Sequence, residues 1–246
     1  MTAHPAAAES GARTGTRAEP VPLNPQQRQA VEHSGSPLLI VAGAGSGKTR
    51  VLAQRIGHLL ATGSSPGAIL AITFTNKAAA EMRERVTALV GPRGRAMWVS
   101  TFHSMCVRIL RAEAAALGLK SSFSIYDADD SRRLMTMVAR DLELDAKRYP
   151  PRSLSNQVSN LKNELVTPPM WAERAATAPE KALAEAYTLY QRRLGEAHAL
   201  DFDDLIMSTV RLLREFPAVA EHYRRRFREV LVDEYQDTNH AQYVLV

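Results

Sequence analysis

The chain has 246 residues, of which 45% are hydrophobic and 23% charged, and its formal net charge at pH 7 is +5. This composition is typical of globular domains and excludes fibrous and wholly disordered chains. No window reaches the roughly 18 consecutive apolar residues of a membrane helix, and the N-terminus lacks the apolar core of a signal peptide. The single cysteine, Cys106, excludes an internal disulfide, so we expect a cytoplasmic protein with no membrane partner.

The N-terminal stretch and the segment after it differ in pattern. Residues 1–20 are rich in Ala, Thr, Gly, Pro and Glu without apolar periodicity, which predicts a disordered tail. Asn24 followed by Pro25 predicts a helix start, with Asn24 as N-cap and Pro25 in the first helical position. We expect this short helix to run to about Val31.

A glycine-rich turn follows the apolar run Leu38–Val41, which we expect to form a buried strand. The turn ends in Gly47-Lys48-Thr49, a form typical of a phosphate-binding loop, although Ala42 replaces its usual first glycine. Lys48 could reach outer phosphates and Thr49 could hold a magnesium ion. The alternative is a glycine-rich turn that only connects a strand to a helix. The candidate nucleotide contacts are Ala42, Gly43, Ala44, Gly45, Ser46, Gly47, Lys48, Thr49 and Arg50.

Three further β-rich apolar runs cover residues 69–74, 98–102 and 230–232, with helical patterns between the first runs. Strands that are apolar throughout and alternate with helices predict a parallel sheet covered by helices on both faces. From about residue 111 to 197 the alternation stops and the pattern is helical. This block is too long for a crossover, so we expect an inserted all-α subdomain at 111–197 within an α/β lobe formed by 21–110 and 198–246.

Two acidic residues, Asp233 and Glu234, follow the last apolar run. Asp233 could hold magnesium, and Glu234 could orient or deprotonate an attacking water. Ligands of open α/β sheets bind beyond the carboxyl ends of the strands, where the glycine turn and the acidic pair both fall. Gln236, close behind, could respond to the terminal phosphate. An isolated acidic pair is more often a surface feature, and the glycine turn is what makes this one informative.

The region between residues 50 and 110 carries eight basic and two acidic residues, a local net charge of +6 that suggests a polyanionic partner. Within it, Phe74 precedes the polar stretch Thr75-Asn76-Lys77, and an aromatic face beside phosphate donors suits single-stranded nucleic acid. Thr101 and His103 follow the next strand. The alternatives are a solvated surface, core packing for Phe74 and a structural role for His103.

Five segments together resemble the UvrD/PcrA/Rep group of superfamily 1 DNA helicases. Residues 233–239 (DEYQDTN) are similar to motif II of that group. Residues 23–31, 71–79 and 100–104 resemble the Q motif, motif Ia and motif Ib, and residues 201–206 resemble a segment after the group's inserted subdomain. The resemblance covers the chain from about residue 22 to its end.

This resemblance implies a RecA-like P-loop NTPase lobe that uses ATP and Mg²⁺, with Gln27 on the adenine base. It also implies a 3′-to-5′ translocase or helicase that acts on single-stranded DNA and on single-strand/duplex junctions, with repair or replication proteins as partners. Lys48, Asp233, Glu234 and Gln236 would be catalytic, and Thr49 and Asp233 would bind the metal. The residues implied for DNA are Thr73, Phe74, Thr75, Asn76, Lys77, Thr101 and His103.

The later motifs of the group do not occur in the sequence, so we expect an N-terminal fragment with an incomplete sheet and an exposed sheet edge. Such a fragment would hydrolyse ATP slowly at best and would not unwind DNA alone. One alternative is a fragment that binds nucleotide or DNA without catalysis. Another is a small-molecule P-loop kinase, against which residues 74–77 and 233–239 argue.

Overall fold

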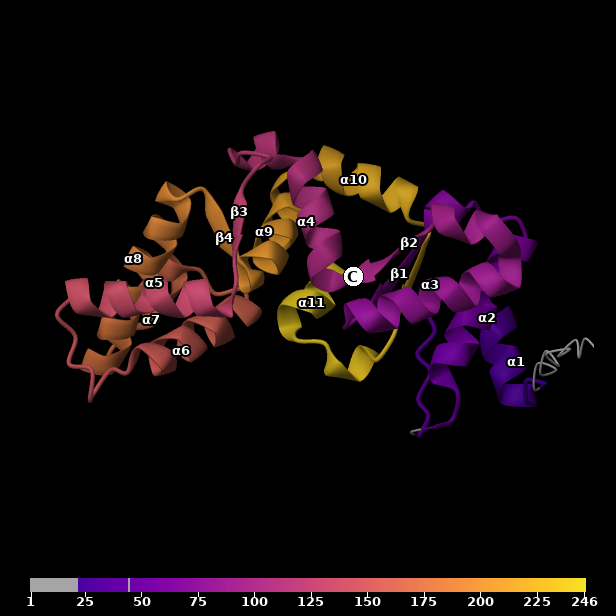
Figure 1. Ribbon diagram of the computed structural model, residues 1–246, viewed down its shortest axis with the longest axis horizontal. Coiled ribbons are helices and arrows are strands. Elements are labelled where there is room, and N and C mark those ends of the chain that lie inside the picture. Colours follow the sequence, from indigo (N-terminus) through magenta and orange to yellow (C-terminus); the bar gives the residue numbers. More distant parts are fainter. Residues whose placement is uncertain (1–21, 44) are drawn as a thin grey trace, which may run out of the picture.

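The computed structural model describes residues 22–43 and 45–246, which form an α/β part and a helical part side by side along the long axis (Figure 1). The predicted disordered tail, residues 1–20, and the loop residue Ala44 lie outside the described residues. Among the described residues, no helix has the length and apolar character needed to cross a membrane.

The α/β part contains a parallel sheet of three strands in the order β2-β1-β5. They are β1 (Ile69–Thr73), β2 (Trp98–Thr101) and β5 (Glu229–Val232). Leu70 of β1 pairs with Trp98 on one side and Val230 on the other. Every residue of the central strand β1 is buried, which explains why its sequence is apolar throughout and confirms the predicted parallel sheet.

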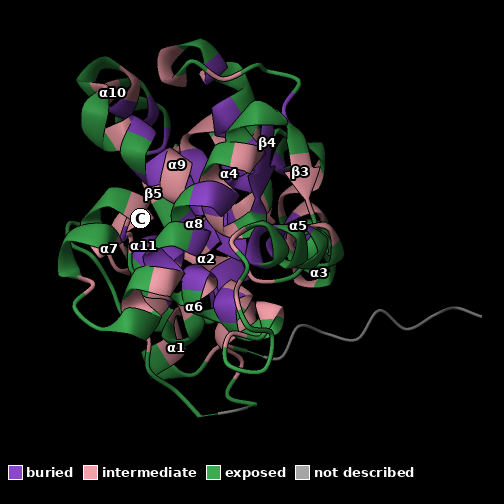
Figure 2. Ribbon diagram, turned by 90° about the vertical axis from the view of Figure 1, so that its left-hand side faces the viewer, coloured by how far each residue is buried: buried purple, intermediate pink, exposed green. Residues whose placement is uncertain are grey.

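Helices cover both faces of this sheet, as the sequence predicted. Ile69 and Ala71 face α2 (Lys48–Ala61) and α3 (Asn76–Val90). Leu70 and Ile72 face the opposite core, which includes α4 (Phe102–Ala112), α9 (Phe202–Glu215), α10 (Pro217–Arg226) and α11 (His240–Leu245). Cys106 lies in this second core with no exposed surface. Buried residues gather on the inner sides of α4, α8 and α9 (Figure 2).

The prediction of a buried strand at Leu38–Val41 is wrong. These residues have no strand structure, and Leu38, Leu39 and Val41 are 40%, 66% and 87% exposed. An apolar run forms a strand only where a neighbouring strand satisfies its backbone N–H and C=O groups. In the described part of the chain, the edge of β5 that faces away from β1 pairs with no strand.

The helix α1 (Pro25–Glu32) begins where the sequence predicted, with Asn24 as its N-cap and Pro25 in its first turn. Arg55 of α2 holds the other end of α1. Its guanidinium donates to the carbonyl oxygens of Ala30 at 3.0 Å, Val31 at 3.3 Å and His33 at 2.7 Å. The first helix is therefore fixed against the helix that follows the glycine loop.

The helical part has its own core, to which Met135, Val138, Leu154, Tyr187 and Leu194 contribute. Its helices are α5 (Ala128–Asp141), α6 (Pro151–Asn163), α7 (Pro168–Arg174) and α8 (Ala178–Glu196). Short 3₁₀ turns elsewhere are η1 (Pro66–Ala68), η2 (Gly91–Ala96), η3 (Ala114–Leu117) and η4 (Tyr235–Asp237).

The block 111–197 is not all-α. It contains the strand β3 (Ser124–Tyr126), which pairs in parallel with β4 (Ala199–Asp201) just outside the block. In addition, α4 runs through Ala112, so the predicted boundary at 110/111 falls inside a helix. A strand of three residues is too short to display an alternating pattern, which is why the sequence did not reveal β3.

Candidate nucleotide and nucleic-acid site

The glycine loop has a backbone that requires glycine at two positions. Gly45 and Gly47 have φ angles of +75° and +87°, in the left-handed region that side chains with a Cβ rarely adopt. Gly47 is the N-cap of α2, so Lys48 is the first residue of that helix. The N-terminus of a helix carries free N–H groups and a partial positive charge, which suits phosphate. Each predicted loop residue that the structure describes therefore lies at or beside this helix end.

The side chain of Lys48 extends from the start of α2 to the beginning of the glycine loop. Its ammonium donates to the carbonyl oxygens of Ala42 at 2.9 Å and Gly43 at 3.4 Å. These are bonds to exposed backbone carbonyls, which a phosphate could replace without leaving a buried group unsatisfied. The lysine is thus held at the loop by partners that can be exchanged.

Thr49 and Asp233 meet although 184 positions separate them in the sequence. The Thr49 hydroxyl donates to Oδ2 of Asp233 at 3.4 Å. Asp233 extends the pairing of β5, since its N–H donates to the carbonyl of Ile72 at 2.9 Å. Burial, and then the charge of Glu234, raise the pKa of Asp233 above its ordinary value. The structure thus brings together Thr49 and Asp233, the two residues predicted to bind the metal.

These two oxygens suit Mg²⁺, which favours hard oxygen ligands and usually takes only one or two from protein, with water and phosphate supplying the rest. Among the described residues no group of three or more His, Cys, Asp or Glu side chains could hold a metal. Thr49 and Asp233 are therefore candidates for the one or two protein oxygens that Mg²⁺ usually takes.

Glu234 has an unusual backbone for a residue with a side chain, with φ at +52°. Its carboxylate accepts a hydrogen bond from Nε2 of Gln236 at 2.5 Å. Gln236 is exposed, so its side chain is free to exchange this partner. Arg50 lies half-buried in the first turn of α2, and its role stays a prediction.

The side-chain amide of Gln27 joins the start of α1 to the glycine loop. Its Oε1 accepts from the N–H of Asn24 at 3.0 Å, completing a capping box at the start of α1. Its Nε2 donates to the carbonyl of Ser46 at 3.0 Å. Gln27 therefore lies beside the glycine loop, and its predicted contact with adenine stays a prediction.

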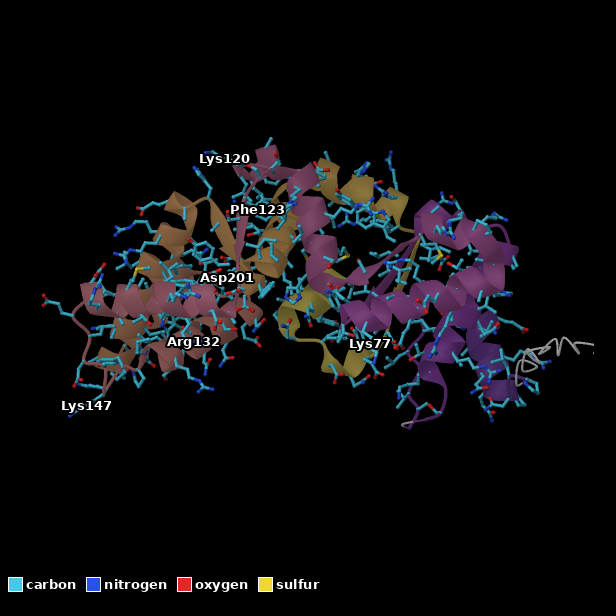
Figure 3. The ribbon with its side chains drawn as sticks, viewed as in Figure 1. Lys77, Lys120, Phe123, Arg132, Lys147 and Asp201 are labelled. Atoms are coloured by element: carbon cyan, nitrogen blue, oxygen red, sulfur yellow. The ribbon has the colours of Figure 1, made fainter. Side chains whose placement is uncertain are left out.

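The predicted DNA residues after β1 divide into two groups. Thr73 is buried and donates to the carbonyl of Thr75 at 3.1 Å, while the Thr75 hydroxyl caps α3 by accepting from the N–H of Ala78 at 3.1 Å. Both hydroxyls thus build the turn. Asn76 and Lys77 are exposed, and Lys77 lies at the start of α3 (Figure 3).

The aromatic residue Phe74 is half-buried and packs edge-on against Phe102 of α4, with ring centroids 5.6 Å apart. It therefore contributes to the core and retains some accessible ring. Thr101 is buried and caps α4 by accepting from the N–H of Ser104 at 3.2 Å. The alternative of core packing for Phe74 thus holds for part of its ring.

The sequence did not reveal Phe202 as a candidate. This first residue of α9 is 46% exposed, and its ring meets that of His103 edge-on at 5.5 Å. Burial lowers the pKa of His103, so the imidazole is neutral at pH 7. The available signal was an aromatic directly after Asp201, which ends β4 and caps α9. Phe202 and His103 form an aromatic surface beyond the strand ends.

Comparisons with known proteins show relatives over most of the chain. The model of the UvrD/REP helicase N-terminal domain matches residues 23–246. The chain is 67% identical over 229 residues to the ATP-dependent DNA helicase UvrD1 of Mycobacterium tuberculosis and 64% identical over 230 residues to UvrD1 of Mycobacterium leprae. It is 50% identical over 225 residues to the ATP-dependent DNA helicase PcrA of Staphylococcus aureus.

Each of these alignments covers 91% of this chain but only 30% of UvrD1 or 31% of PcrA. The chain thus spans about 30% of the length of the curated relatives it matches. The family match extends over nearly all the described residues and includes the glycine loop, the acidic pair and the helical part. The chain belongs to the UvrD/REP helicase N-terminal domain family.

Proposed function

We propose that this chain forms part of an ATP-dependent 3′-to-5′ DNA translocase and helicase and supplies one side of its ATP site. The observation that carries this proposal is the contact between Thr49 and Asp233, which joins the glycine loop to the acidic strand end. A loop that merely connected a strand to a helix would not need a carboxylate beside its hydroxyl. The α/β part, which includes the whole of α4, would form the motor lobe, and the helical part with α5 to α8 would form the inserted subdomain.

Each residue of the proposed site has a role that its position allows. Lys48 would exchange the loop carbonyls for the outer phosphates of ATP. Thr49 and Asp233 would hold Mg²⁺, which neutralises phosphate charge during the reaction. Glu234 would orient the water that attacks the terminal phosphorus, releasing ADP and phosphate, and Gln236 would hold the Glu234 carboxylate in place.

Single-stranded DNA, including single-strand/duplex junctions, is the proposed second ligand. Phe202 presents an exposed ring that packs on the half-buried His103, and the exposed residues Asn76 and Lys77 at the start of α3 would contact phosphates. Stacking on aromatic rings is insensitive to sequence and contributes about 1–3 kcal/mol per base. Such an enzyme would act in the cytoplasm, in DNA repair or replication, with protein partners from those processes.

Nucleotide binding is tested by titrating the 246-residue chain with a fluorescent ATP analogue and Mg²⁺. We expect Lys48→Ala to weaken binding about 10-fold to 100-fold, because it removes charge-assisted contacts to phosphate. Lys147→Ala, at an exposed lysine of the helical part, is the matched control and should bind as the parent does. Equal affinity of the Lys48→Ala chain and its parent would contradict the proposed ATP site.

DNA binding is tested separately, by fluorescence anisotropy with a labelled oligothymidylate at low salt. Phe202→Ala should weaken binding about 5-fold to 100-fold, in line with the loss of one stacked base. Met170→Ala removes another exposed apolar side chain, on α7, and should leave the affinity unchanged. Equal losses from both substitutions would argue against a specific stacking surface.

A second candidate is binding of nucleotide and DNA without turnover. The small share of its relatives that the chain covers favours this candidate. Phosphate release measured with and without DNA separates the two. DNA-stimulated release that disappears in Glu234→Gln supports hydrolysis by this chain, whereas binding without release supports the second candidate.

A further inference from the structure

The last turn of α6 joins the helical part to the α/β part through one polar helix face. Ser159, Lys162 and Asn163 lie at the spacing that places side chains on the same side of a helix. Nδ2 of Asn163 donates to the Ser159 hydroxyl at 3.5 Å. Lys162 forms ion pairs with Asp201, the N-cap of α9, and with Asp204 in the first turn of that helix. Asn163 faces a different partner, at the start of α11.

Lys162 is buried and held by two carboxylates. Its ammonium lies 2.7 Å from Asp201 and 2.8 Å from Asp204. Tyr190 donates to Asp201 at 2.8 Å, and Gln191 donates to Asp204 at 3.1 Å. Asp201 lies where α6, α8 and α9 meet (Figure 3). A buried ion pair saturated with hydrogen bonds has one favourable geometry, so α6 cannot slide along α9 without leaving charges unpaired.

Asn163 connects this fixed helix end to the segment after the acidic pair. Its Oδ1 accepts from Nδ2 of Asn239 at 2.7 Å. The Oδ1 of Asn239 at the same time accepts from the N–H of Gln242 at 2.8 Å and so caps α11. The side chain of Asn239 therefore holds two elements together, α11 through its acceptor and α6 through its donor.

Only four residues separate Glu234 from Asn239, and hydrogen bonds close the segment between them. The N–H of Asp237 donates to the carbonyl of Glu234 at 2.9 Å. Both the N–H and the hydroxyl of Thr238 donate to the carbonyl of Tyr235, at 3.2 and 2.8 Å. A short turn closed by hydrogen bonds moves as a rigid unit. A displacement of Glu234 would therefore also displace Asn239.

Glu234 can supply such a displacement. Its left-handed backbone, with φ at +52°, costs free energy in a residue with a side chain. Its partner Gln236 is exposed and exchangeable. Engagement of a ligand by Glu234 can therefore favour a second backbone arrangement over the present one.

We propose that Asn163 and Asn239 are positioning residues that transmit nucleotide occupancy at the acidic pair to the helical part, with the Lys162 cluster as the fixed point on the α6 side. This inference rests on the proposed function, because it requires a nucleotide at Asp233 and Glu234. A purely structural bond would hold α6 and α11 together but would not respond to a nucleotide.

Hydrogen exchange of the 246-residue chain, with and without a saturating non-hydrolysable ATP analogue and Mg²⁺, tests this inference. In the parent chain we expect the nucleotide to change the exchange rate at least 3-fold both in 235–245 and in the last turn of α6. In Asn163→Ala the change should persist in 235–245 and disappear from α6, with an unchanged nucleotide dissociation constant. Asn239→Ser should give the same result, because serine retains the helix cap but is too short to reach Asn163.

The matched control is Asn160→Ala, on the exposed side of the same helix, which should respond as the parent does. Thermal melting of all three variants shows that each is folded before exchange is measured. A nucleotide response that persists in α6 of both junction variants, or that never appears in α6 of the saturated parent, overturns the inference while leaving the proposed function intact. Failure of the parent to bind the nucleotide overturns both.

Discussion

The glycine loop and the end of α6 each hold a lysine, but the hydrogen-bond partners of the two lysines differ in exposure. In the loop, Lys48 bonds two exposed backbone carbonyls, and the preceding segment Leu38–Val41 pairs with no strand in the described structure. At α6, Lys162 is buried and bonds two carboxylates that are themselves fixed by Tyr190 and Gln191. One lysine has partners that a ligand can replace, and the other has partners that are almost completely buried.

This difference separates residues that a ligand uses from residues that the fold uses. A group that must bind and release a phosphate loses little when its present hydrogen bonds are exchanged with solvent. A buried charge loses a great deal when one partner is removed, because the remaining charges are left without compensation. Removing each lysine should therefore affect different measured quantities.

The largest effect on stability should come from Lys162→Met. It leaves Asp201 and Asp204 buried without a cation, which should lower the free energy of unfolding by about 3–5 kcal/mol. Urea unfolding followed by circular dichroism measures this change. Lys147→Ala, at an exposed lysine, is the control and should change it by less than about 0.5 kcal/mol. Similar losses from both substitutions would remove the contrast between buried and exposed lysines.

The pH dependence of stability should change in Asp204→Asn. Burial raises the pKa of Asp204 to about 6, whereas an unfolded aspartate titrates near 4. Between these values the folded chain binds more protons than the unfolded chain, so this residue makes stability fall as pH rises through the window. The substitution should flatten that fall by on the order of 2 kcal/mol. Parallel stability curves for the two proteins from pH 4 to pH 7 would contradict this assignment.

Gly47→Ala tests the backbone of the loop. At φ of +87° an added Cβ is strained, so we expect a loss of about 1 kcal/mol in the free energy of unfolding. Gly195→Ala is the matched control, because Gly195 lies in the last turn of α8 with no neighbour within 4 Å of an added Cβ. It should be neutral or stabilising by up to about 1 kcal/mol. Thermal melting measures the change in stability of both variants. A loss in Gly195→Ala as large as that in Gly47→Ala would contradict the role of the backbone angle.

The smallest effect on stability should come from Lys48→Ala. Its hydrogen bonds join an exposed ammonium to carbonyls that water can satisfy, so the free energy of unfolding should change by less than about 0.5 kcal/mol. The same variant should lose nucleotide affinity. A loss of several kcal/mol in the urea unfolding of this variant would show that the loop lysine serves the fold as well.

The sequence predicted those parts of the fold whose pattern is local. Asn24 and Pro25 begin α1, and β1 and β2 lie within the predicted apolar runs, because capping and burial are set by neighbouring residues. Leu38–Val41 has the same apolar pattern but no strand, since strand formation also depends on a distant partner. The pairing of β3 with β4 depends on residues 75 positions apart, which no local window contains.

The candidate site was predictable to a similar degree. Motif chemistry identified Thr49 and Asp233, and the structure places them in contact. It did not indicate that Thr75 and Thr101 serve as helix caps, because capping depends on where each strand ends. Phe202 and the Lys162 cluster were missed because a sequence does not show whether a given phenylalanine is exposed or whether a given lysine is buried. Only the folded chain distinguishes accessible groups from enclosed ones.

The buried thiol of Cys106 is a natural probe of how often the core around it opens. It is the single cysteine of the chain, has no exposed surface, and lies in the core shared by α4 and α9, where burial raises its pKa to about 12. A thiol reagent can therefore modify it only when those helices separate, and the modification rate reports how often they do. Asp201 caps α9 and Asp204 lies in its first turn, so the modification rate of Cys106 would also report how often the Lys162 cluster opens. This experiment needs no engineered probe.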